Sequence, residues 1–194
     1  MTKKLRLVVL LSGDGSIFEA IVAAIEARRL NAEILMVISD NPNAYGLTRA
    51  RLHNLNTQVI NAKEYNDKSE FQRALKEALL SLNPDFIVLS GFMRILAADI
   101  IQALPKRILN IHPALLPKYP GLHTHERVLA AGDKKHGTTV HFVDEGLDSG
   151  PIIGQRELTV LPGDTAESLQ QRVKELEKVL YPEVLQCFSE KKYK

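Results

Sequence analysis

Short apolar runs alternate with amphipathic segments through the first half of this 194-residue chain. Runs such as Leu5 to Leu11 are apolar at every position except Arg6, which favours strands that are buried on both faces of a sheet. Segments such as Lys68 to Leu82 instead place apolar side chains on one face of a helix. Strands that alternate with helices indicate right-handed crossovers and a parallel sheet, so the sequence predicts an α/β fold.

The expected strands are Leu5 to Leu11, Glu33 to Ser39, Thr57 to Ile60, Asp85 to Ser90, Ile108 to Ile111, Thr138 to Val143 and Ile152 to Val160. The expected helices are Ile17 to Arg29, Ala44 to Leu52, Lys68 to Leu82, Ala97 to Leu104, His125 to Ala131 and Thr165 to about Phe188. Pro182 should kink or split the last helix. We therefore expect one domain over residues 1–194, with a doubly wound, mostly parallel twisted sheet of about seven strands and helices on both faces.

Composition narrows the possible partners. The formal net charge is +2 and the basic residues are spread along the chain, which argues against a dedicated nucleic-acid surface. Cys187 is the only cysteine, so neither an internal disulfide nor a cysteine zinc cluster can form, and we expect a cytoplasmic protein. No stretch approaches the roughly 20 apolar residues of a membrane span. The basic start, Met1 to Arg6, precedes an apolar run that ends in Ser-Gly-Asp-Gly, and we interpret that run as a strand rather than a signal peptide.

Asn110 and His112 stand at the end of an expected strand, before a proline-rich loop. Because they are two residues apart on an extended backbone, their side chains should point to the same side. The carboxyl ends of strands in an open α/β sheet are where such folds place chemistry. Asp148 is the most suggestive partner, since a carboxylate beside an imidazole should raise the pKa of His112 above about 6.5. The alternatives are that Asn110 caps a turn, His112 packs under the prolines, and Asp148 only caps backbone amides.

A glycine-rich turn, Ser12-Gly13-Asp14-Gly15-Ser16, joins the first expected strand to the first expected helix. Backbone amides at such a helix start form an anion site, and a lone phosphate is the better guess. The turn lacks the third glycine of a dinucleotide fingerprint, where Phe18 stands, and it lacks the Gly-Lys-Ser/Thr of a P-loop. A tight turn that merely needs glycines remains the alternative.

The six histidines invite a metal interpretation, in which His123 and His125 are two ligands on an extended segment. The chain has neither of the helical zinc motifs built from paired histidines and a glutamate, so we do not expect a metal. Arg94 follows Gly-Phe-Met and could contact an acidic ligand, or it could be a solvated helix start.

Several motifs occur in a fixed order along the chain. They are Ser12 to Ser16, Gly91 to Leu96, Asn110 to Pro113, Leu115 to His125, and His136 to Thr138 followed by Asp148-x-Gly150-Pro151. This ordered set closely resembles the phosphoribosylglycinamide formyltransferases, a branch of the folate-dependent formyltransferase family. The resemblance covers essentially the whole chain and implies a Rossmann-like fold.

The resemblance implies transfer of a formyl group from 10-formyltetrahydrofolate to the amine of glycinamide ribonucleotide in purine synthesis, without a metal. Asn110, His112 and Asp148 would be the catalytic residues: Asn110 and a protonated His112 stabilise the oxyanion, and His112 passes a proton to the departing folate nitrogen. Residues 1–104 would form a phosphate- and substrate-binding half, and residues 105–194 a catalytic and folate-binding half.

The resemblance also implies binding residues. The backbone amides of Gly15, Ser16 and Ile17 would hold the substrate phosphate, although the family commonly has Asn at the position of Ile17 and often at that of Asp14. Lys174 and Glu177 would hold the glycinamide. The residues expected around the folate are Lys68, Met93, Arg94, Ile95, Leu96, Asp144, Glu145, Gly146 and Leu147.

Other functions use similar residues. A 10-formyltetrahydrofolate hydrolase would use the same three residues with water as acceptor, but it resembles this chain plus an N-terminal regulatory domain. Methionyl-tRNA formyltransferases carry an added C-terminal domain, and formyltransferases acting on sugar-nucleotide amines are longer. A catalytically silent phosphate- or folate-binding module would leave the Asn-x-His and the distant Asp unexplained. We expect small-molecule substrates, no nucleic acid or membrane partner, and a monomer or homodimer.

Overall fold

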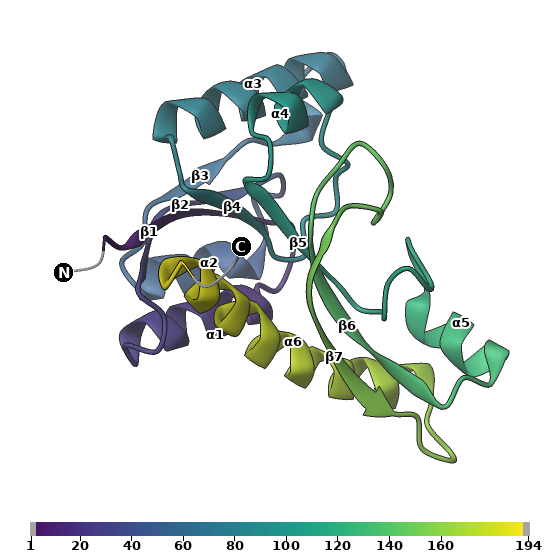
Figure 1. Cartoon of the computed structure of the whole chain (residues 1–194). Helices are drawn as coiled ribbons and strands as arrows, with labels where there is room; N and C mark the ends of the chain where they lie inside the picture. Colours follow the sequence, from purple (N-terminus) through teal and green to yellow (C-terminus); the bar gives the residue numbers. More distant parts are fainter. Residues whose placement is uncertain (1–2, 192–194) are drawn as a thin grey trace.

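The computed structural model describes residues 3–191, which form a seven-stranded sheet with helices on both faces (Figure 1). The strands are β1 (Leu5–Leu11), β2 (Ala32–Ser39), β3 (Thr57–Val59), β4 (Phe86–Leu89), β5 (Ile108–His112), β6 (Lys135–Phe142) and β7 (Ile152–Thr159). Their order is β3-β2-β1-β4-β5-β6-β7. The first five strands run parallel, and β6 and β7 are added antiparallel. The expected α/β fold with a mostly parallel sheet is confirmed.

The helices are α1 (Ser16–Glu26), α2 (Tyr45–Leu52), α3 (Lys68–Leu82), α4 (Ala98–Ala103), α5 (Thr124–Ala131) and α6 (Ala166–Ser189), with a short 3₁₀ turn at Ala62–Glu64. Figure 1 shows α3 and α4 on one side of the sheet and α1 and α6 on the other. No helix within residues 3–191 combines the length and the apolar character that a bilayer crossing requires.

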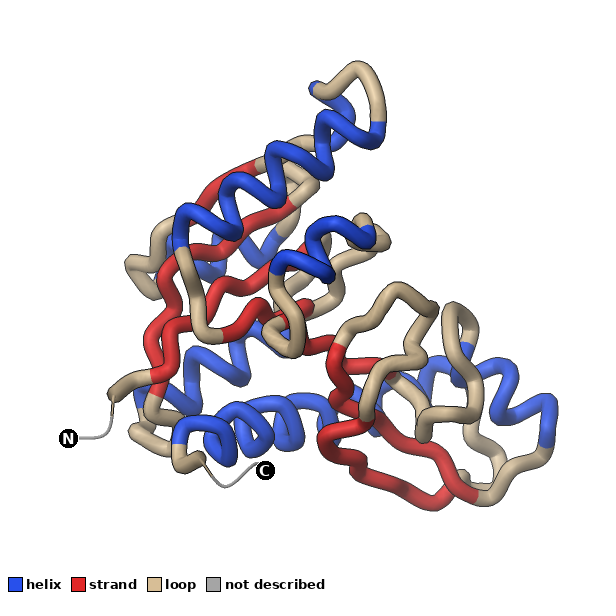
Figure 2. The backbone as a smooth tube through the Cα atoms, turned by 45° about the horizontal axis from the view of Figure 1, so that its top comes forward, coloured by secondary structure: helices blue, strands red, loops and turns tan. Residues whose placement is uncertain are grey.

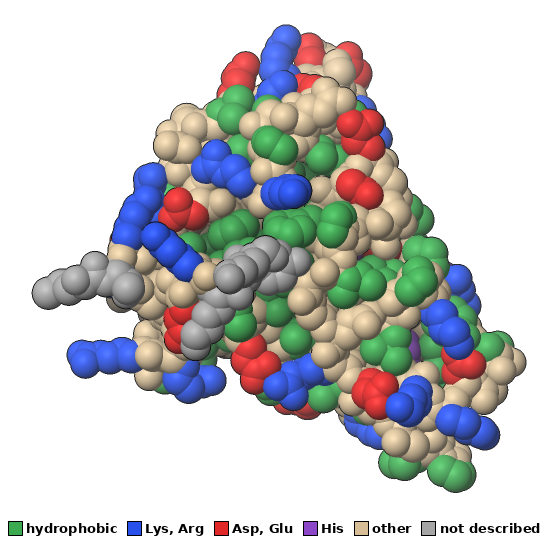
Figure 3. Space-filling view, viewed as in Figure 1, with side chains coloured by type: hydrophobic (Ala, Val, Ile, Leu, Met, Phe, Trp, Pro, Cys, Tyr) green, Lys and Arg blue, Asp and Glu red, His purple; other side chains and the backbone are tan. Residues whose placement is uncertain are grey.

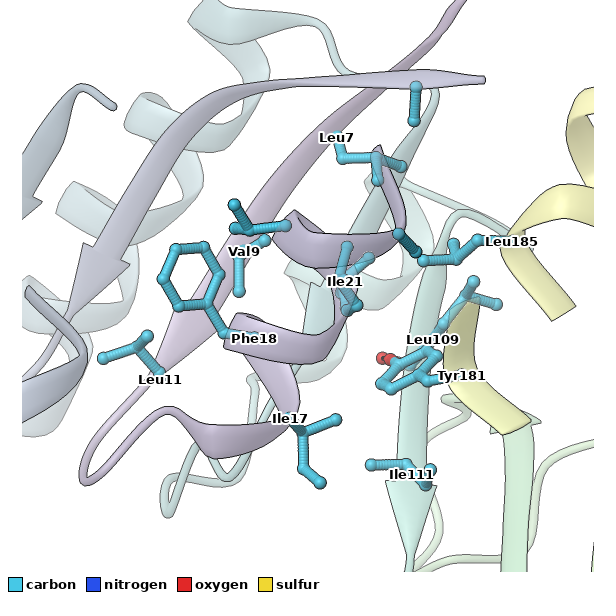
Figure 4. Packing of buried hydrophobic residues seen from close by; sticks show 14 of the residues in the cluster. Leu7, Val9, Leu11, Ile17, Phe18, Ile21, Leu109, Ile111, Tyr181 and Leu185 are labelled. Atoms are coloured by element: carbon cyan, nitrogen blue, oxygen red, sulfur yellow. Dashed lines mark hydrogen bonds between the residues drawn. The ribbon is translucent and has the colours of Figure 1, made fainter. Parts of the chain in front are cut away.

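The core has two layers, one on each side of β1. Leu7, Val9 and Leu11 belong to the layer beneath α1, α2 and α6, and Figure 4 shows them with their neighbours. Val8 and Leu10 belong to the layer beneath α3 and α4. Successive side chains of a strand point to opposite faces, so an apolar run without a break fits a strand covered on both sides.

The last helix differs from its prediction. The expected split at Pro182 does not occur, because α6 continues from Ala166 to Ser189 with the proline inside it. A proline within a helix costs about 3 kcal/mol, whereas each large apolar side chain that is fully buried contributes about 1.5–3 kcal/mol. Tyr181 and Leu185, on either side of Pro182, are both fully buried. The packing of α6 against the sheet therefore offsets the local cost.

The loops at the carboxyl ends of the parallel strands are tied together. The Ser12 amide after β1 donates to the carbonyl of Gly91 after β4 (3.1 Å), and the Met93 amide donates to the Ser12 hydroxyl (2.9 Å). Toward the β6–β7 end of the sheet, Figure 2 shows the long loop after β5 beside the loop between β6 and β7. The Gly121 amide in the first of these loops donates to Asp148 in the second (2.9 Å). These contacts join the loop after β1 to the loop after β4, and the loop after β5 to the loop that carries Asp148.

Candidate functional site

His112 is the last residue of β5 and its side chain is buried. Its Nε2 atom lies 2.8 Å from the carbonyl oxygen of Tyr119. Since a carbonyl oxygen only accepts, Nε2 must carry a proton. The other nitrogen, Nδ1, lies 3.3 Å from Oδ2 of Asp148. Nδ1 is therefore the ring atom at which a proton can be gained or lost.

Asp148 contacts groups from both neighbouring loops and strands. Its Oδ2 accepts the Gly121 amide (2.9 Å), and its Oδ1 lies 3.4 Å from Nδ2 of Asn110. The residue adopts a left-handed backbone conformation with φ of 51°, which turns its side chain toward β5. The capping alternative thus describes part of its role, but Asp148 also meets the two residues that the strand spacing singled out. The structure brings Asn110, His112 and Asp148 together.

His141 is a residue of this cluster that the sequence interpretation missed. Its Nδ1 donates to the carbonyl of Phe142 (2.8 Å), and its Nε2 lies 3.2 Å from Nδ2 of Asn110 and 3.6 Å from Oδ1 of Asp148. The antiparallel register pairs Asn110 with His141 across β5 and β6. The signal was the alternation of Thr139 and His141 on one face of the expected strand, which the metal hypothesis did not use.

The pKa of His112 is shifted in the direction opposite to the prediction. Burial lowers the pKa of His112, and although the Tyr119 carbonyl and Asp148 raise it, burial dominates. The prediction considered the carboxylate but not the loop that removes the ring from water. The pKa of Asp148 is lowered. Burial raises this pKa, but hydrogen bonds from His141 and Gly121 and the nearby rings of His112 and His141 together outweigh burial. Asp148 is therefore a carboxylate at neutral pH.

A cluster of polar side chains around the buried Thr139 holds the loop that follows His112. The Thr139 hydroxyl donates to the Ala114 carbonyl (2.6 Å) and accepts from the Leu116 amide (3.1 Å). Gln155 on β7 donates to the same hydroxyl (2.9 Å) and to the Leu116 carbonyl (2.8 Å). The backbone that presents the Tyr119 carbonyl to His112 is thus anchored to β6 and β7.

The glycine-rich turn forms the start of α1. Gly15 has a φ of 75°, and a side chain added there would meet the backbone of Gly46 at 2.8 Å. Ser16 and Ile17 open α1, where backbone amides have no intrahelical acceptor. The acidic Asp14 turns toward cations, with Oδ1 3.2 Å from Arg49 and Oδ2 3.9 Å from Lys174. These partners lower the pKa of Asp14 against the effect of its partial burial.

Lys174 and Glu177 come from the same helix, α6. Glu177 is buried, which raises its pKa to about 7 even though Lys174 and the Thr138 hydroxyl act in the opposite direction. The Thr138 hydroxyl donates its proton to the backbone carbonyl of His112 (2.9 Å), so Thr138 lies between Glu177 and the strand end that carries His112.

The residues expected around a folate are partly surface and partly core. Met93 and Ile95 are 69% and 71% exposed, whereas Leu96 is buried in the core layer beneath α3. Arg94 is bound to Asp40. Lys68 opens α3. Figure 3 shows hydrophobic side chains gathered across this view of the molecule, with a histidine visible among them.

In the loop between β6 and β7, Leu147 is exposed. Asp144 accepts from the Gly146 amide (3.1 Å) and the Ser149 hydroxyl (2.8 Å), so it shapes its own loop, while Glu145 accepts from Gln102 (2.8 Å). Leu122 is also strongly exposed and was not predicted as a site residue, although it lies in one of the ordered motifs.

The two histidines of the metal hypothesis do not converge. His123 is exposed and faces Glu126 at 3.5 Å, whereas His125 is buried and its Nδ1 lies 3.0 Å from Nε2 of His136. Within residues 3–191, no group of three or more histidine, cysteine or acidic side chains is arranged to hold a metal ion.

Comparison with known proteins gives consistent matches. A family model described as formyl transferase matches residues 5–185. A phosphoribosylglycinamide formyltransferase of Escherichia coli (strain K12) is 40% identical over 190 residues, covering 98% of this chain and 90% of its own length. The solved phosphoribosylglycinamide formyltransferase of Brucella melitensis is 47% identical with a TM-score of 0.92, covering 96% of each chain. That of Coxiella burnetii is 45% identical with a TM-score of 0.92, covering 97% of this chain and 88% of the other.

Proposed function

This chain belongs to the formyl transferase family, and on that premise we propose that it transfers a formyl group from 10-formyltetrahydrofolate to the amine of 5-phosphoribosylglycinamide in purine synthesis. The observation that carries the proposal is the meeting of Asn110, His112 and Asp148 at the end of β5. An amide donor, an imidazole and a carboxylate are the groups that acyl transfer to an amine needs.

We propose that the folate binds against exposed apolar side chains of two loops. A pterin is flat and needs apolar walls, which the exposed side chains of Met93, Ile95 and Leu147 can supply. Asp144, Glu145 and Gly146 would shape the loop that carries Leu147, and Leu96 would fix the backbone from its place in the core. Lys68 would offer a positive charge to the acidic tail of the folate.

In the proposed mechanism, the formyl folate supplies an electrophilic carbon bonded to a nitrogen that can leave. The substrate amine forms a bond to that carbon, and Nδ2 of Asn110 donates a hydrogen bond to the formyl oxygen as negative charge develops there. Nδ1 of His112 accepts the proton that the amine loses and then donates it to the departing folate nitrogen. No proton is gained or lost overall.

The lowered pKa of His112 agrees with this sequence of proton transfers. Burial lowers the pKa of His112, so Nδ1 can accept a proton at neutral pH in the free protein. Once negative charge develops on the formyl oxygen, a second anion joins Asp148 near the ring and favours the protonated form. Protonated His112 is then stabilised at the stage when the reaction needs it, which is the condition for lowering the barrier.

For the ribonucleotide, we propose that the backbone amides of Gly15, Ser16 and Ile17 bind the phosphate at the start of α1. Asp14 does not oppose this role, because its carboxylate is already paired with Arg49. Lys174 and Glu177 on α6 would hold the glycinamide portion.

We also propose a single catalytic domain in the cytoplasm. The proposed phosphate-binding turn lies in residues 1–104 and the proposed reacting groups lie in residues 105–194, and each half would contribute to both substrates. Met93 lies in the first half but would bind the folate, and Glu177 lies in the second half but would bind the ribonucleotide.

The proposal is tested by following the formyl carbon. The protein is incubated with 10-formyltetrahydrofolate carrying ¹³C in the formyl group, with and without 5-phosphoribosylglycinamide, and the products are identified by NMR. We expect the label in an N-formyl amide only when the ribonucleotide is present. Label that appears as formate in both samples would instead identify a hydrolase.

A further inference from the structure

Asp40 and Arg94 form an ion pair across the end of β1. Asp40 directly follows β2, and Arg94 lies in the segment after β4, with β1 between these two strands in the sheet. Oδ2 of Asp40 lies 2.8 Å from Nε of Arg94. The carboxylate is 7% exposed and the arginine side chain is 45% exposed. The pair thus joins a buried anion to a cation that reaches the surface.

Besides its ion pair with Asp40, Arg94 packs against an aromatic ring of α3. The ring of Phe71 on α3 lies beneath the guanidinium, with 5.8 Å between its centroid and the central carbon. Gln72, the next residue of α3, holds the backbone that follows Arg94: its side-chain amide donates to the Ile95 carbonyl (2.9 Å) and accepts from the Ala97 amide (2.9 Å). Both the backbone and the side chain of Arg94 therefore have few alternative positions.

The tether leaves one edge of the guanidinium open. Asp40 takes the Nε hydrogen, and among residues 3–191 neither terminal nitrogen of Arg94 has a hydrogen-bond partner. Two parallel N–H groups on that edge match the two oxygens of a carboxylate. Arg94 is flanked in the chain by Met93 and Ile95, two exposed apolar residues of the stretch where the proposed function places the folate.

We propose that Asp40 is a positioning residue that holds the open edge of Arg94 ready for a glutamate carboxylate of the formyl donor. The inference rests on the proposed function, which supplies a donor whose negative charges at neutral pH are the carboxylates of its glutamate tail. Asp40 makes no contact with the donor and acts through the arginine. By fixing Arg94 before binding, it makes donor affinity depend on a carboxylate.

The burial of Asp40 supports a role that depends on Arg94. Its Oδ1 atom is buried without a hydrogen-bond partner among the described residues, so Arg94 is the group that compensates the buried charge. Removing Arg94 would leave that charge uncompensated, which is costly in a protein interior. An Asp40→Asn substitution keeps an oxygen that can accept from Nε, whereas Asp40→Ala removes the tether.

The test compares two formyl donors in the unaltered protein and in two variants, D40A and D40N. One donor carries the glutamate tail, and the other ends in an uncharged amide at the same benzoyl group. Ordering a free arginine side chain costs about as much free energy as a tenfold change in affinity. We therefore expect D40A to raise KM for the glutamyl donor roughly tenfold with kcat within about twofold. The uncharged donor should have the same KM in D40A, D40N and the unaltered protein.

Two comparisons separate positioning from a general loss of stability. D40N should restore most of the affinity that D40A loses, because it retains the acceptor. D164N removes an equally buried carboxylate, 7% exposed and paired with Arg172 at 2.6 Å, and should leave KM for both donors unchanged. In an R94A background, D40A should have no further effect on KM for the glutamyl donor. If D40A alone does not fold, KM for the two donors is compared instead in D40N, in R94A and in the R94A/D40A double variant.

An equal rise in KM for both donors, or a fall in kcat with both, would overturn the inference and leave Asp40 a structural residue. Unchanged KM values in D40A would overturn it as well. If the unaltered protein transfers no formyl group, the proposed function fails separately. In that case, calorimetry measures the affinity for tetrahydrofolate with and without its glutamate. The Asp40 inference requires that the unaltered protein bind the truncated folate more weakly than the intact folate. It also requires that this difference disappear in D40A.

Discussion

The carbonyl oxygen of Tyr119 lies 2.8 Å from Nε2 of His112, and this contact determines which ring nitrogen can take part in proton transfer. The carbonyl belongs to the loop that begins directly after His112 and folds back over it. Nδ1 is left facing Asp148 at 3.3 Å. The conformation of a loop thus controls the protonation chemistry of the residue that precedes it.

The first prediction concerns the titration of His112. Because burial outweighs the Tyr119 carbonyl and Asp148, the pKa of His112 is lowered from 6.5, and the ring should be neutral with its proton on Nε2 at pH 7. In ¹⁵N-labelled protein, NMR should give a titration midpoint below 6.5. Asp148→Asn removes a group that raises this pKa and should move the midpoint lower still. A midpoint above 6.5 would mean that the ion pair dominates over burial.

The second prediction concerns Asn110. If its Nδ2 donates to the formyl oxygen as charge develops, Asn110→Ala should reduce kcat by on the order of 100-fold or more, with a small change in KM. The control is Asn56→Ala, which shortens an exposed asparagine in the turn before β3. The measurement is kcat with both substrates at saturation. If N110A and N56A have the same kcat, Asn110 does not take part in the mechanism.

The third prediction concerns two buried groups that link stability to pH with opposite signs. The pKa of His136 is lowered from 6.5 to about 4, chiefly by burial, so its contribution is present above pH 6.5 and lost as the pH falls toward 4. The pKa of Glu177 is raised from 4.5 to about 7, so its contribution is present below pH 4.5 and lost as the pH rises toward 7. Each amounts to about 3 kcal/mol at most.

Urea unfolding at pH 7.5 and pH 5 should therefore separate the two groups. Relative to the unaltered protein, His136→Gln should lose less stability on acidification, and Glu177→Gln should lose more. His123→Gln changes an exposed histidine and controls for the loss of an imidazole as such. Equal pH dependence in all four proteins would show that neither buried group titrates as described.

The fourth prediction concerns the glycine-rich turn. Gly15→Ala forces a side chain into a left-handed conformation, which costs about 1–2 kcal/mol, and also against the Gly46 backbone. Gly132→Ala has the same conformational cost, with φ of 66°, but no atom within 4 Å of the added carbon. G15A should therefore be less stable than G132A in urea unfolding and should alone raise KM for the ribonucleotide. Similar stabilities would mean that the turn can move away from α2.

Much of the fold was predictable because its cause is local. The apolar run of β1, which only Arg6 interrupts, and the amphipathic pattern of α3 each specify an element without reference to the rest of the chain. The same holds for Asn110 and His112, whose two-residue spacing on a strand is enough to put them on one side.

Features that depend on distant contacts were not predictable. The His141 contact with Asn110 requires the antiparallel register of β5 and β6, which no single segment specifies. The lowered pKa of His112 requires the burial that the following loop provides. The continuity of α6 through Pro182 requires the packing of Tyr181, whose hydroxyl donates to the Leu109 carbonyl at 2.8 Å. In each case a long-range interaction overrides the local expectation.

The most direct test of the central claim is the release of tetrahydrofolate from a 10-formyl donor, followed by absorbance with and without 5-phosphoribosylglycinamide. We predict release at an appreciable rate only when the ribonucleotide is present, and its loss in N110A. Release at the same rate without the ribonucleotide, with formate as the other product, would contradict the account.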